Sequence, residues 1–438
     1  MHAAAKPESF ITRILRKMAS SKLHRETAWA GTAKISALIL FFLINVILAR
    51  VLGVERYGRW NYLFSILTTA VLAGDFGITA SARVWAARGQ REGTLTGVIT
   101  AAIHLKLGIS LISASLFFLC GPLLAELVQR PDLAFPLRMG GVFLFCQGFC
   151  DFLKAFFEGL HSNRYVLIIS LAEQLSRLAL VVAFVYLAAG FTMLLLSFSA
   201  AAGVAGLLGI WLLYKKEFTG RGPHISARAF YGPIAQYAAT LFLVSLMAFI
   251  TLEISTLMLG YMTNDYEVGL YTPAKLIASK SLHLGGIVAI GTTPVFADMS
   301  SARVAYLRRL LRKVLLLLCG VYAVLVVAVL GLAEPIVRLL FGAEYLAGAA
   351  TLRVMTLFMF ALGVSSVLQF ILNYRGEAAR RARNLGISVI LTVALNYVLI
   401  PRYGAFGAGV ATALSFVPYA VLSYRDVLRS LRRAESEI

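Results

Sequence analysis

The sequence predicts an all-α, polytopic membrane protein, and three observations support this fold class. Of its 438 residues, 59% are hydrophobic and only 14% are charged, whereas soluble proteins have about 45–50% apolar and about 25% charged residues. The mean hydropathy is +0.81. Apolar runs of about 20 residues, the length that crosses a bilayer as a helix, recur along the chain. Lipid tolerates outward-facing apolar side chains, so these features exclude a soluble globular protein.

Twelve apolar runs are long enough to be membrane spans. Their ranges are 29–50, 58–83, 94–120, 134–157, 165–187, 191–213, 230–260, 267–297, 313–333, 349–373, 384–401 and 405–424. With the N-terminus inside, 28 Lys and Arg residues fall in cytoplasmic segments and 8 in outer segments. Because basic residues are enriched in cytoplasmic loops, we expect both termini in the cytoplasm and the loops near Pro131 and Ala189 outside.

An internal repeat predicts two lobes. Residues 57–60 (YGRW) parallel residues 268–271 (VGLY) at an offset of 211, and residues 177–191 align with residues 392–406. Both matches relate a span to the sixth span after it, so the halves share one orientation, as parallel repeats do. We therefore expect two parallel six-helix lobes around a central cavity. The predicted divisions are a basic amphipathic cytoplasmic segment 1–28, an N-terminal lobe 29–213, a linker 214–229, a C-terminal lobe 230–424 and a cytoplasmic tail 425–438.

The positions of the basic residues and cysteines, and the motifs that the sequence lacks, disfavour several classes of function. The net charge of +20 suggests nucleic-acid binding in a soluble protein, but here the basic residues lie in short loops between apolar runs. The four cysteines, all within apolar runs, form no disulfide or zinc pattern. Because the sequence shows no phosphate-binding loop, metal cluster or nucleophile triad, we expect neither an enzyme nor a cofactor or metal site.

Ionisable residues inside the predicted spans are the candidate site, because charges in a bilayer are costly and usually functional. The basic members, expected to bind an anionic substrate, are Lys34, Lys106, Arg177, Lys275 and Lys280. The acidic members, candidates for ion coupling or for contacts between the lobes, are Asp75, Asp151, Glu173 and Glu253.

Two of these cations also have a purely structural interpretation. Arg177 follows Glu173 by four residues, the spacing of an ion pair on one helix face. Lys34 lies about five residues into the first span and can extend to the cytoplasmic interface. Both interpretations stay open beside the binding role.

Four segments carry a resemblance to a known family. They are residues 48–58 (LARVLGVERYG), residues 75–77 (DFG), residues 269–275 (GLYTPAK) and residues 341–345 (FGAEY). Together they resemble the bacterial polysaccharide-biosynthesis flippases, in the superfamily that also contains multidrug exporters and oligosaccharidyl-lipid flippases. The likeness extends over essentially the whole chain, and twelve spans fit the O-antigen-type members.

The resemblance implies a flippase of the bacterial inner membrane, acting in the biosynthesis of cell-surface polysaccharide. Such a protein moves a polyprenyl-diphosphate-linked oligosaccharide from the cytoplasmic to the outer leaflet by alternating access of two lobes. The implied partners are this anionic lipid-linked glycan, membrane lipids and other glycan-assembly membrane proteins, with no nucleic acid.

Two other functions compete with this interpretation. A cation-coupled drug or metabolite antiporter of the same superfamily is expected to have acidic cavity residues, whereas five cations lie inside the spans here. A membrane glycan polymerase or ligase usually has a large outer loop or an acidic metal-binding motif, and the sequence shows neither. The intramembrane cations therefore favour transport of an anion.

Overall fold

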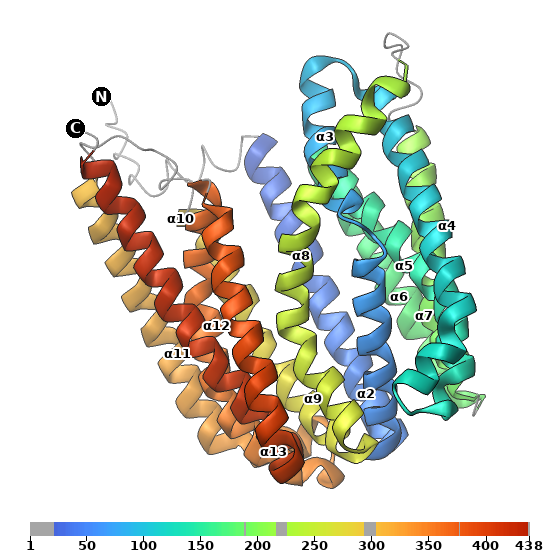
Figure 1. Ribbon diagram of the computed structural model, residues 1–438, viewed down its shortest axis with the longest axis vertical. Coiled ribbons are helices and arrows are strands. Elements are labelled where there is room, and N and C mark those ends of the chain that lie inside the picture. The colour runs from blue at the N-terminus through green and yellow to red at the C-terminus, as the bar shows by residue number, and fades with distance from the viewer. Residues whose placement is uncertain (1–21, 188–189, 216–225, 293–303, 376, 437–438) are drawn as a thin grey trace, which may run out of the picture. The chain divides into compact units, whose positions relative to one another are not determined.

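The structure, a computed structural model, describes residues 22–187, 190–215, 226–292, 304–375 and 377–436. Within these ranges the chain is helical and contains no strand. The helices are α2 (Lys22–Ala73), α3 (Ile78–Glu92), α4 (Leu95–Leu127), α5 (Ala134–Gly159), α6 (Asn163–Tyr186), α7 (Phe191–Leu213), α8 (Arg228–Met262), α9 (Asp265–Ser279), α10 (Ser281–Thr292), α11 (Val304–Leu340), α12 (Ala349–Tyr374) and α13 (Ala378–Ser436), with two short 3-10 helices, η1 (Pro131–Leu133) and η5 (Ala343–Gly348) (Figure 1).

The predicted fold class is confirmed. Among the described residues, nine helices are long and apolar enough to cross a membrane. Two of them are kinked: α2 joins the span 29–50 to the first part of the span 58–83 across Gly53, and α13 joins the spans 384–401 and 405–424 across Gly404. Each predicted run coincides with helix over most of its length. The chain is therefore an all-helical, multi-pass membrane protein.

Two predicted spans are interrupted in the structure. The run 58–83 comprises the end of α2 and the start of α3, separated by residues 74–77. The described part of the run 267–297, residues 267–292, comprises most of α9 and all of α10, which separate at Lys280. Hydropathy does not detect such breaks because the residues on both sides stay apolar.

Backbone conformation explains the kinks at Gly53 and Gly404 and the break at residues 74–77. Gly53, Gly77 and Gly404 have φ angles of 71°, 80° and 50°. Residues with a Cβ atom rarely adopt such positive values. At Gly404 the following amide is capped, because the backbone N–H of Ala405 donates to Oε2 of Glu267 at 2.6 Å. The chain therefore turns where glycine permits it, and at Gly404 a side chain also satisfies the freed amide.

The described chain forms two compact units. Unit 1 contains the described residues within 1–44, 74–121 and 138–242. Unit 2 contains those within 45–73, 122–137 and 243–438. Unit 2 thus combines the C-terminal half with two segments of the N-terminal half. The lobe boundaries 29–213 and 230–424 stay a prediction, and the predicted segment 1–28 and linker 214–229 lie mostly outside the described residues.

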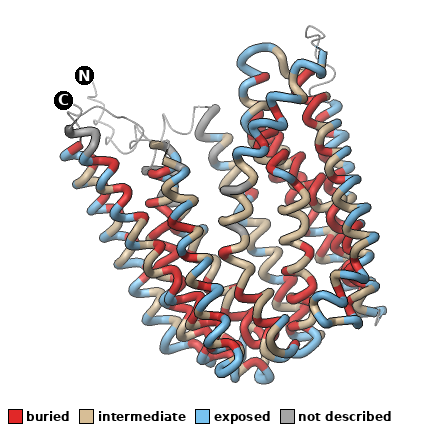
Figure 2. Tube along the Cα trace, in the orientation of Figure 1, coloured by how far each residue is buried: buried red, intermediate tan, exposed pale blue. Residues whose placement is uncertain are grey.

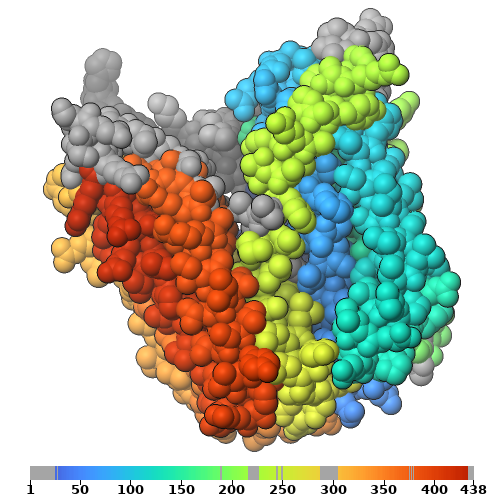
Figure 3. All heavy atoms as spheres, viewed as in Figure 1, coloured from blue at the N-terminus to red at the C-terminus, as the bar shows by residue number. Residues whose placement is uncertain are grey.

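Each unit has an apolar core built from helix stripes. In unit 1, Phe149, Phe152 and Phe156 follow one face of α5, with successive ring centroids 5.8 Å and 6.0 Å apart. In unit 2, a stripe of α11 that includes Leu307 and Leu311 is buried with residues of α12 and α13. These three helices pack along one another (Figure 3). Buried residues follow the packed faces and exposed residues the opposite ones (Figure 2), which is the pattern of helices whose other face meets lipid.

Candidate functional site

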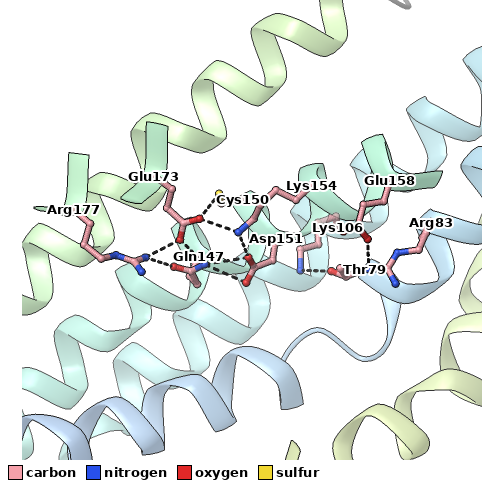
Figure 4. A network of polar contacts seen from close by, with 10 residues as sticks. All are labelled: Thr79, Arg83, Lys106, Gln147, Cys150, Asp151, Lys154, Glu158, Glu173 and Arg177. Atoms are coloured by element: carbon pink, nitrogen blue, oxygen red, sulfur yellow. Dashed lines mark hydrogen bonds and ion pairs between the residues drawn. The ribbon is translucent and has the colours of Figure 1, made fainter. Parts of the chain in front are cut away.

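A buried carboxylate, Glu173, is the centre of a polar network in unit 1 (Figure 4). Its Oε2 atom accepts a hydrogen bond from Nζ of Lys154 at 2.8 Å. Its Oε1 atom accepts hydrogen bonds from Nη2 of Arg177 at 2.7 Å and from Nε2 of Gln147 at 3.2 Å. Glu173 is only 2% exposed. A buried charge is stable when it is paired and hydrogen-bonded, and this carboxylate has two cationic partners.

Helical spacing explains how α5 contributes to this network. Gln147, Asp151 and Lys154 recur at intervals of four and three residues, so they share one face of the helix. Nζ of Lys154 lies 2.7 Å from Oδ1 of Asp151. Nε2 of Gln147 donates to both carboxylate oxygens of Asp151, at 3.1 Å and 3.2 Å. Lys154 is therefore shared between two carboxylates that belong to different helices.

Arg177, on α6, is almost completely enclosed. It is 3% exposed. Its Nη2 atom also donates to Oε1 of Gln147 at 3.0 Å, and its guanidinium carbon lies 4.6 Å from the ring centroid of Phe198. The pair with Glu173 that the spacing suggested is present, so the structural interpretation of Arg177 describes its contacts in this state.

A second buried ion pair lies at the break between α2 and α3. Nζ of Lys106, on α4, lies 2.5 Å from Oδ1 of Asp75, and Lys106 is 1% exposed. Asp75 also caps α3, because it accepts hydrogen bonds from the backbone N–H of Thr79 at 3.1 Å and from its hydroxyl at 2.5 Å. One carboxylate thus neutralises Lys106 and satisfies one backbone amide in the first turn of α3.

A cavity of about 290 Å³ in unit 1 adjoins both clusters. Its charged lining residues are Lys34, Arg83, Asp151, Lys154 and Glu158. Nη2 of Arg83 lies 2.8 Å from Oε2 of Glu158. Lys34, on α2, is exposed and has no ion-pair partner among the residues that the structure describes. With three cations and two carboxylates, the cavity lining has an excess of positive charge.

The remaining predicted residues lie in unit 2. Nζ of Lys275, on α9, is 2.6 Å from Oε2 of Glu253 on α8 and donates to Oγ1 of Thr256 at 2.9 Å. The hydroxyl of Ser65 donates to the same Oε2 of Glu253 at 2.7 Å. Lys280 is half-buried where α9 ends. The structure therefore groups Lys106, Arg177 and Lys34 in unit 1, and Lys275 and Lys280 in unit 2.

The sequence interpretation missed part of the site. Lys154 and Arg83 lie near the ends of apolar runs and are absent from the predicted site, whereas in the structure they pair with Glu173 and Glu158. A signal for Lys154 was present, since it follows Asp151 by three residues on one helix. Arg83 and Glu158 lie on different helices, and no spacing relates them. In the described part of the chain, no three His, Cys, Asp or Glu residues come together as metal ligands.

These features define an integral membrane protein of many apolar helices, and solved structures of membrane transporters share its fold. A multidrug resistance MATE family transporter of the MOP superfamily, in an inward-facing conformation, is similar with a TM-score of 0.74 at 13% identity, over 91% of this chain and 96% of the other. The lipid II flippase MurJ, in an inward closed conformation, has a TM-score of 0.72 at 13% identity, over 92% and 89%. The Vibrio cholerae MATE transporter VcmN, in the bent form, has a TM-score of 0.61 at 14% identity, over 96% and 98%.

The family follows from the sequence itself. Residues 23–300 match the family of polysaccharide biosynthesis proteins. This match covers more than half of the chain, which therefore belongs to that family. No curated protein sequence matches the chain. The resemblance is thus confirmed at the level of the family: three of the four motif segments lie within the matched residues, and residues 341–345 lie outside them. The similar structures establish the shared fold.

Proposed function

We propose that the protein is a flippase that moves a polyprenyl-diphosphate-linked oligosaccharide from the cytoplasmic to the outer leaflet. The observation that carries the proposal is membership of the polysaccharide biosynthesis family over residues 23–300. The fold shared with a lipid II flippase supports it. In this proposal the protein lies in the bacterial inner membrane with both termini in the cytoplasm, and two six-helix lobes alternate access for cell-surface polysaccharide biosynthesis.

The substrate's diphosphate sets the electrostatic requirement. An anion entering a hydrocarbon layer about 30 Å thick loses its hydration, and cations along the path offset that loss. In the proposal Lys34, Lys106, Arg177, Lys275 and Lys280 supply this charge. Lys34 makes the first contact, because it is exposed at the cavity in unit 1 and has no acidic partner among the described residues.

The paired cations act by exchange of partners. Asp75, Glu173 and Glu253 hold Lys106, Arg177 and Lys275 at distances of 2.5–2.7 Å, so the empty site carries few unpaired buried charges. Phosphate oxygens accept the same charge-assisted hydrogen bonds as carboxylates. In the proposal the diphosphate displaces the carboxylates, and these, together with Asp151, then take up a coupling ion.

Neutralising Lys34 tests the proposal. In cells that lack any other flippase, Lys34→Gln is expected to lower glycan export about tenfold, because a charge-assisted hydrogen bond contributes roughly 1.5–3 kcal/mol. The matched control is Lys313→Gln, which removes an exposed lysine of α11 in unit 2. Export is measured as surface polysaccharide, with lipid-linked oligosaccharide accumulating in the cytoplasmic leaflet. Normal export by both Lys34→Gln and a well-expressed Lys106→Gln, Lys275→Gln variant contradicts the assignment.

A cation-coupled antiporter is the second candidate, and one observation favours it. Glu173 and Asp151 share Lys154 near the cavity, and a carboxylate that changes partners suits exchange of a coupling cation. Export of a cationic drug by the purified protein in vesicles, driven by an imposed ion gradient and lost in Glu173→Gln protein that is shown to be folded, would support the antiporter. Flipping of a lipid-linked glycan in the same vesicles would support the flippase.

A further inference from the structure

Two glycines at equivalent positions of the internal repeat pack in a reciprocal way. Gly58 lies on α2 and Gly269 on α9, both in unit 2. A Cβ atom on Gly58 would collide with the backbone carbonyl of Asp265, and one on Gly269 would collide with the backbone carbonyl of Val54. Glycine is required at both positions because backbone approaches backbone.

The repeat relates these contacts to each other. The offset that aligns Gly58 with Gly269 also aligns Val54 with Asp265. Each glycine therefore meets the residue that stands four positions before the other glycine. Such reciprocity is the property of an isologous interface, in which a twofold axis makes one surface patch contact its own equivalent. The contact thus joins the two halves of the chain about a local pseudo-twofold axis.

An ion cluster next to the crossing breaks this symmetry. Oδ2 of Asp265 lies 3.1 Å from Nε of Arg59 and 2.7 Å from Nη2 of Arg130. Asp265 is 6% exposed. Burial lowers the pKa of Arg130, but its hydrogen bonds to Asp265 and Asp132 outweigh burial and raise the pKa above its ordinary value. Two cations from the N-terminal half thus converge on one buried carboxylate of the C-terminal half.

Further hydrogen bonds reinforce the same junction. The hydroxyl of Tyr345 donates to the backbone carbonyl of Ala49 at 2.9 Å, and Nε of Arg50 donates to the backbone carbonyl of Leu340 at 2.9 Å. All these contacts involve segments that the charge pattern places at the outer ends of the spans. This is why residues 45–73 and 122–137 belong to unit 2 with the C-terminal half.

We propose that the reciprocal contact of the helices at Gly58 and Gly269 closes the transport path at the outer face. The ion pairs of Asp265 with Arg59 and Arg130 hold this contact in place. The inference rests on the proposed transport function. Asp265 is a positioning residue that holds the two halves together without touching substrate. The crossing depends on close approach of the backbones of α2 and α9. A small separation of these two helices therefore breaks both glycine contacts at once, and the N- and C-terminal halves of the chain then open at the outer face.

The test measures how fast a thiol reagent added outside the cell reaches a cysteine below the crossing, and it needs no substrate. Ser65 lies on the same face of α2 as Gly58, seven residues further along, and is 2% exposed. Ser65→Cys is placed in a chain whose four native cysteines are replaced, and intact cells are treated with a membrane-impermeant thiol reagent. Asp265→Asn is expected to raise the labelling rate about tenfold or more, because it weakens the charge-assisted bonds to Arg59 and Arg130. Gly58→Ala and Gly269→Ala are expected to raise it as well, because the added Cβ forces the two backbones apart.

Matched controls separate opening from general damage. Gly108→Ala adds a Cβ on α4 that meets nothing within 4 Å, and Glu334→Gln removes a carboxylate from an exposed ion pair with Arg353; neither should change the labelling rate. If the glycine variants fail to reach the membrane, Asp265→Asn decides the question because it adds no volume. Unchanged labelling in well-expressed Asp265→Asn overturns the inference. If the substrate assignment is wrong, the labelling result is unaffected. Failure of the proposed flippase function can therefore be distinguished from failure of the proposed closure.

Discussion

Glu173 differs from the other buried carboxylates of the site in having two cationic partners on separate helices. Lys154 reaches its Oε2 atom from α5, and Arg177 reaches its Oε1 atom from α6. Losing either cation leaves the carboxylate paired with the other. Losing the carboxylate leaves two cations inside the unit, although Asp151 still contacts Lys154. The carboxylate is therefore the more sensitive position.

Single and double neutral variants should show this asymmetry. Glu173→Gln is expected to destabilise the folded protein by roughly 3–5 kcal/mol, the cost of leaving a buried charge unpaired. Arg177→Gln should cost less because Lys154 remains. The thermal unfolding temperatures of the purified variants measure both effects. If the Glu173→Gln, Arg177→Gln double variant restores folding and full glycan export, Arg177 is only a structural partner. A larger loss for Arg177→Gln than for Glu173→Gln would contradict the two-partner interpretation.

Each long kinked helix depends on one glycine and on its surroundings. Gly53 has open space apart from the carboxylate of Glu344, whereas a Cβ on Gly404 would meet the carboxylate of Glu267. That carboxylate caps the amide of Ala405. A side chain at Gly404 therefore adds backbone strain and displaces a cap, while a side chain at Gly53 adds mainly strain.

Alanine substitutions within α13 test this account. Gly404→Ala is expected to lower stability by more than about 1 kcal/mol, because the positive φ disfavours alanine and the cap is lost. Gly386→Ala is the control on the same helix, since its Cβ meets nothing within 4 Å; it should be neutral or stabilising by up to about 1 kcal/mol through helix propensity. The fraction of folded protein that survives heating in detergent measures both. Equal behaviour of the two variants would refute the role of the kink.

For the molecule as a whole, the orientation in the membrane follows from charge and awaits a direct test. Basic residues are concentrated in every second segment between the spans, all on one side of the membrane, and this predicts that both termini are cytoplasmic. Cysteines introduced at Pro131 and Ala189, in a background without the native cysteines, should react with an impermeant thiol reagent added outside intact cells. A cysteine at Lys215, in a predicted cytoplasmic segment, should react only after lysis. Labelling of the first two positions from the cytoplasmic side alone would show that the topology is inverted.

The all-helical class and the positions of the apolar runs along the chain were predictable, because each span depends only on its own run of apolar residues and the membrane requires every backbone group within it to be hydrogen-bonded. Ion pairs within one helix were partly predictable from helical spacing, as the pair of Glu173 with Arg177, four residues apart, shows. The breaks at residues 74–77 and at Lys280 were not, since each lies within a run that is apolar over most of its length.

Only the tertiary structure decided which charges meet. Lys106 with Asp75, Lys154 with Glu173 and Lys275 with Glu253 join different helices, and their contact depends on how each helix is rotated and which neighbour it packs against. Hydropathy carries no record of that rotation when both faces of a helix are apolar, as in lipid. The crossing of Gly58 and Gly269 follows the same rule: the repeat was visible in the chain, but the reciprocal backbone contact arises only when the two helices pack.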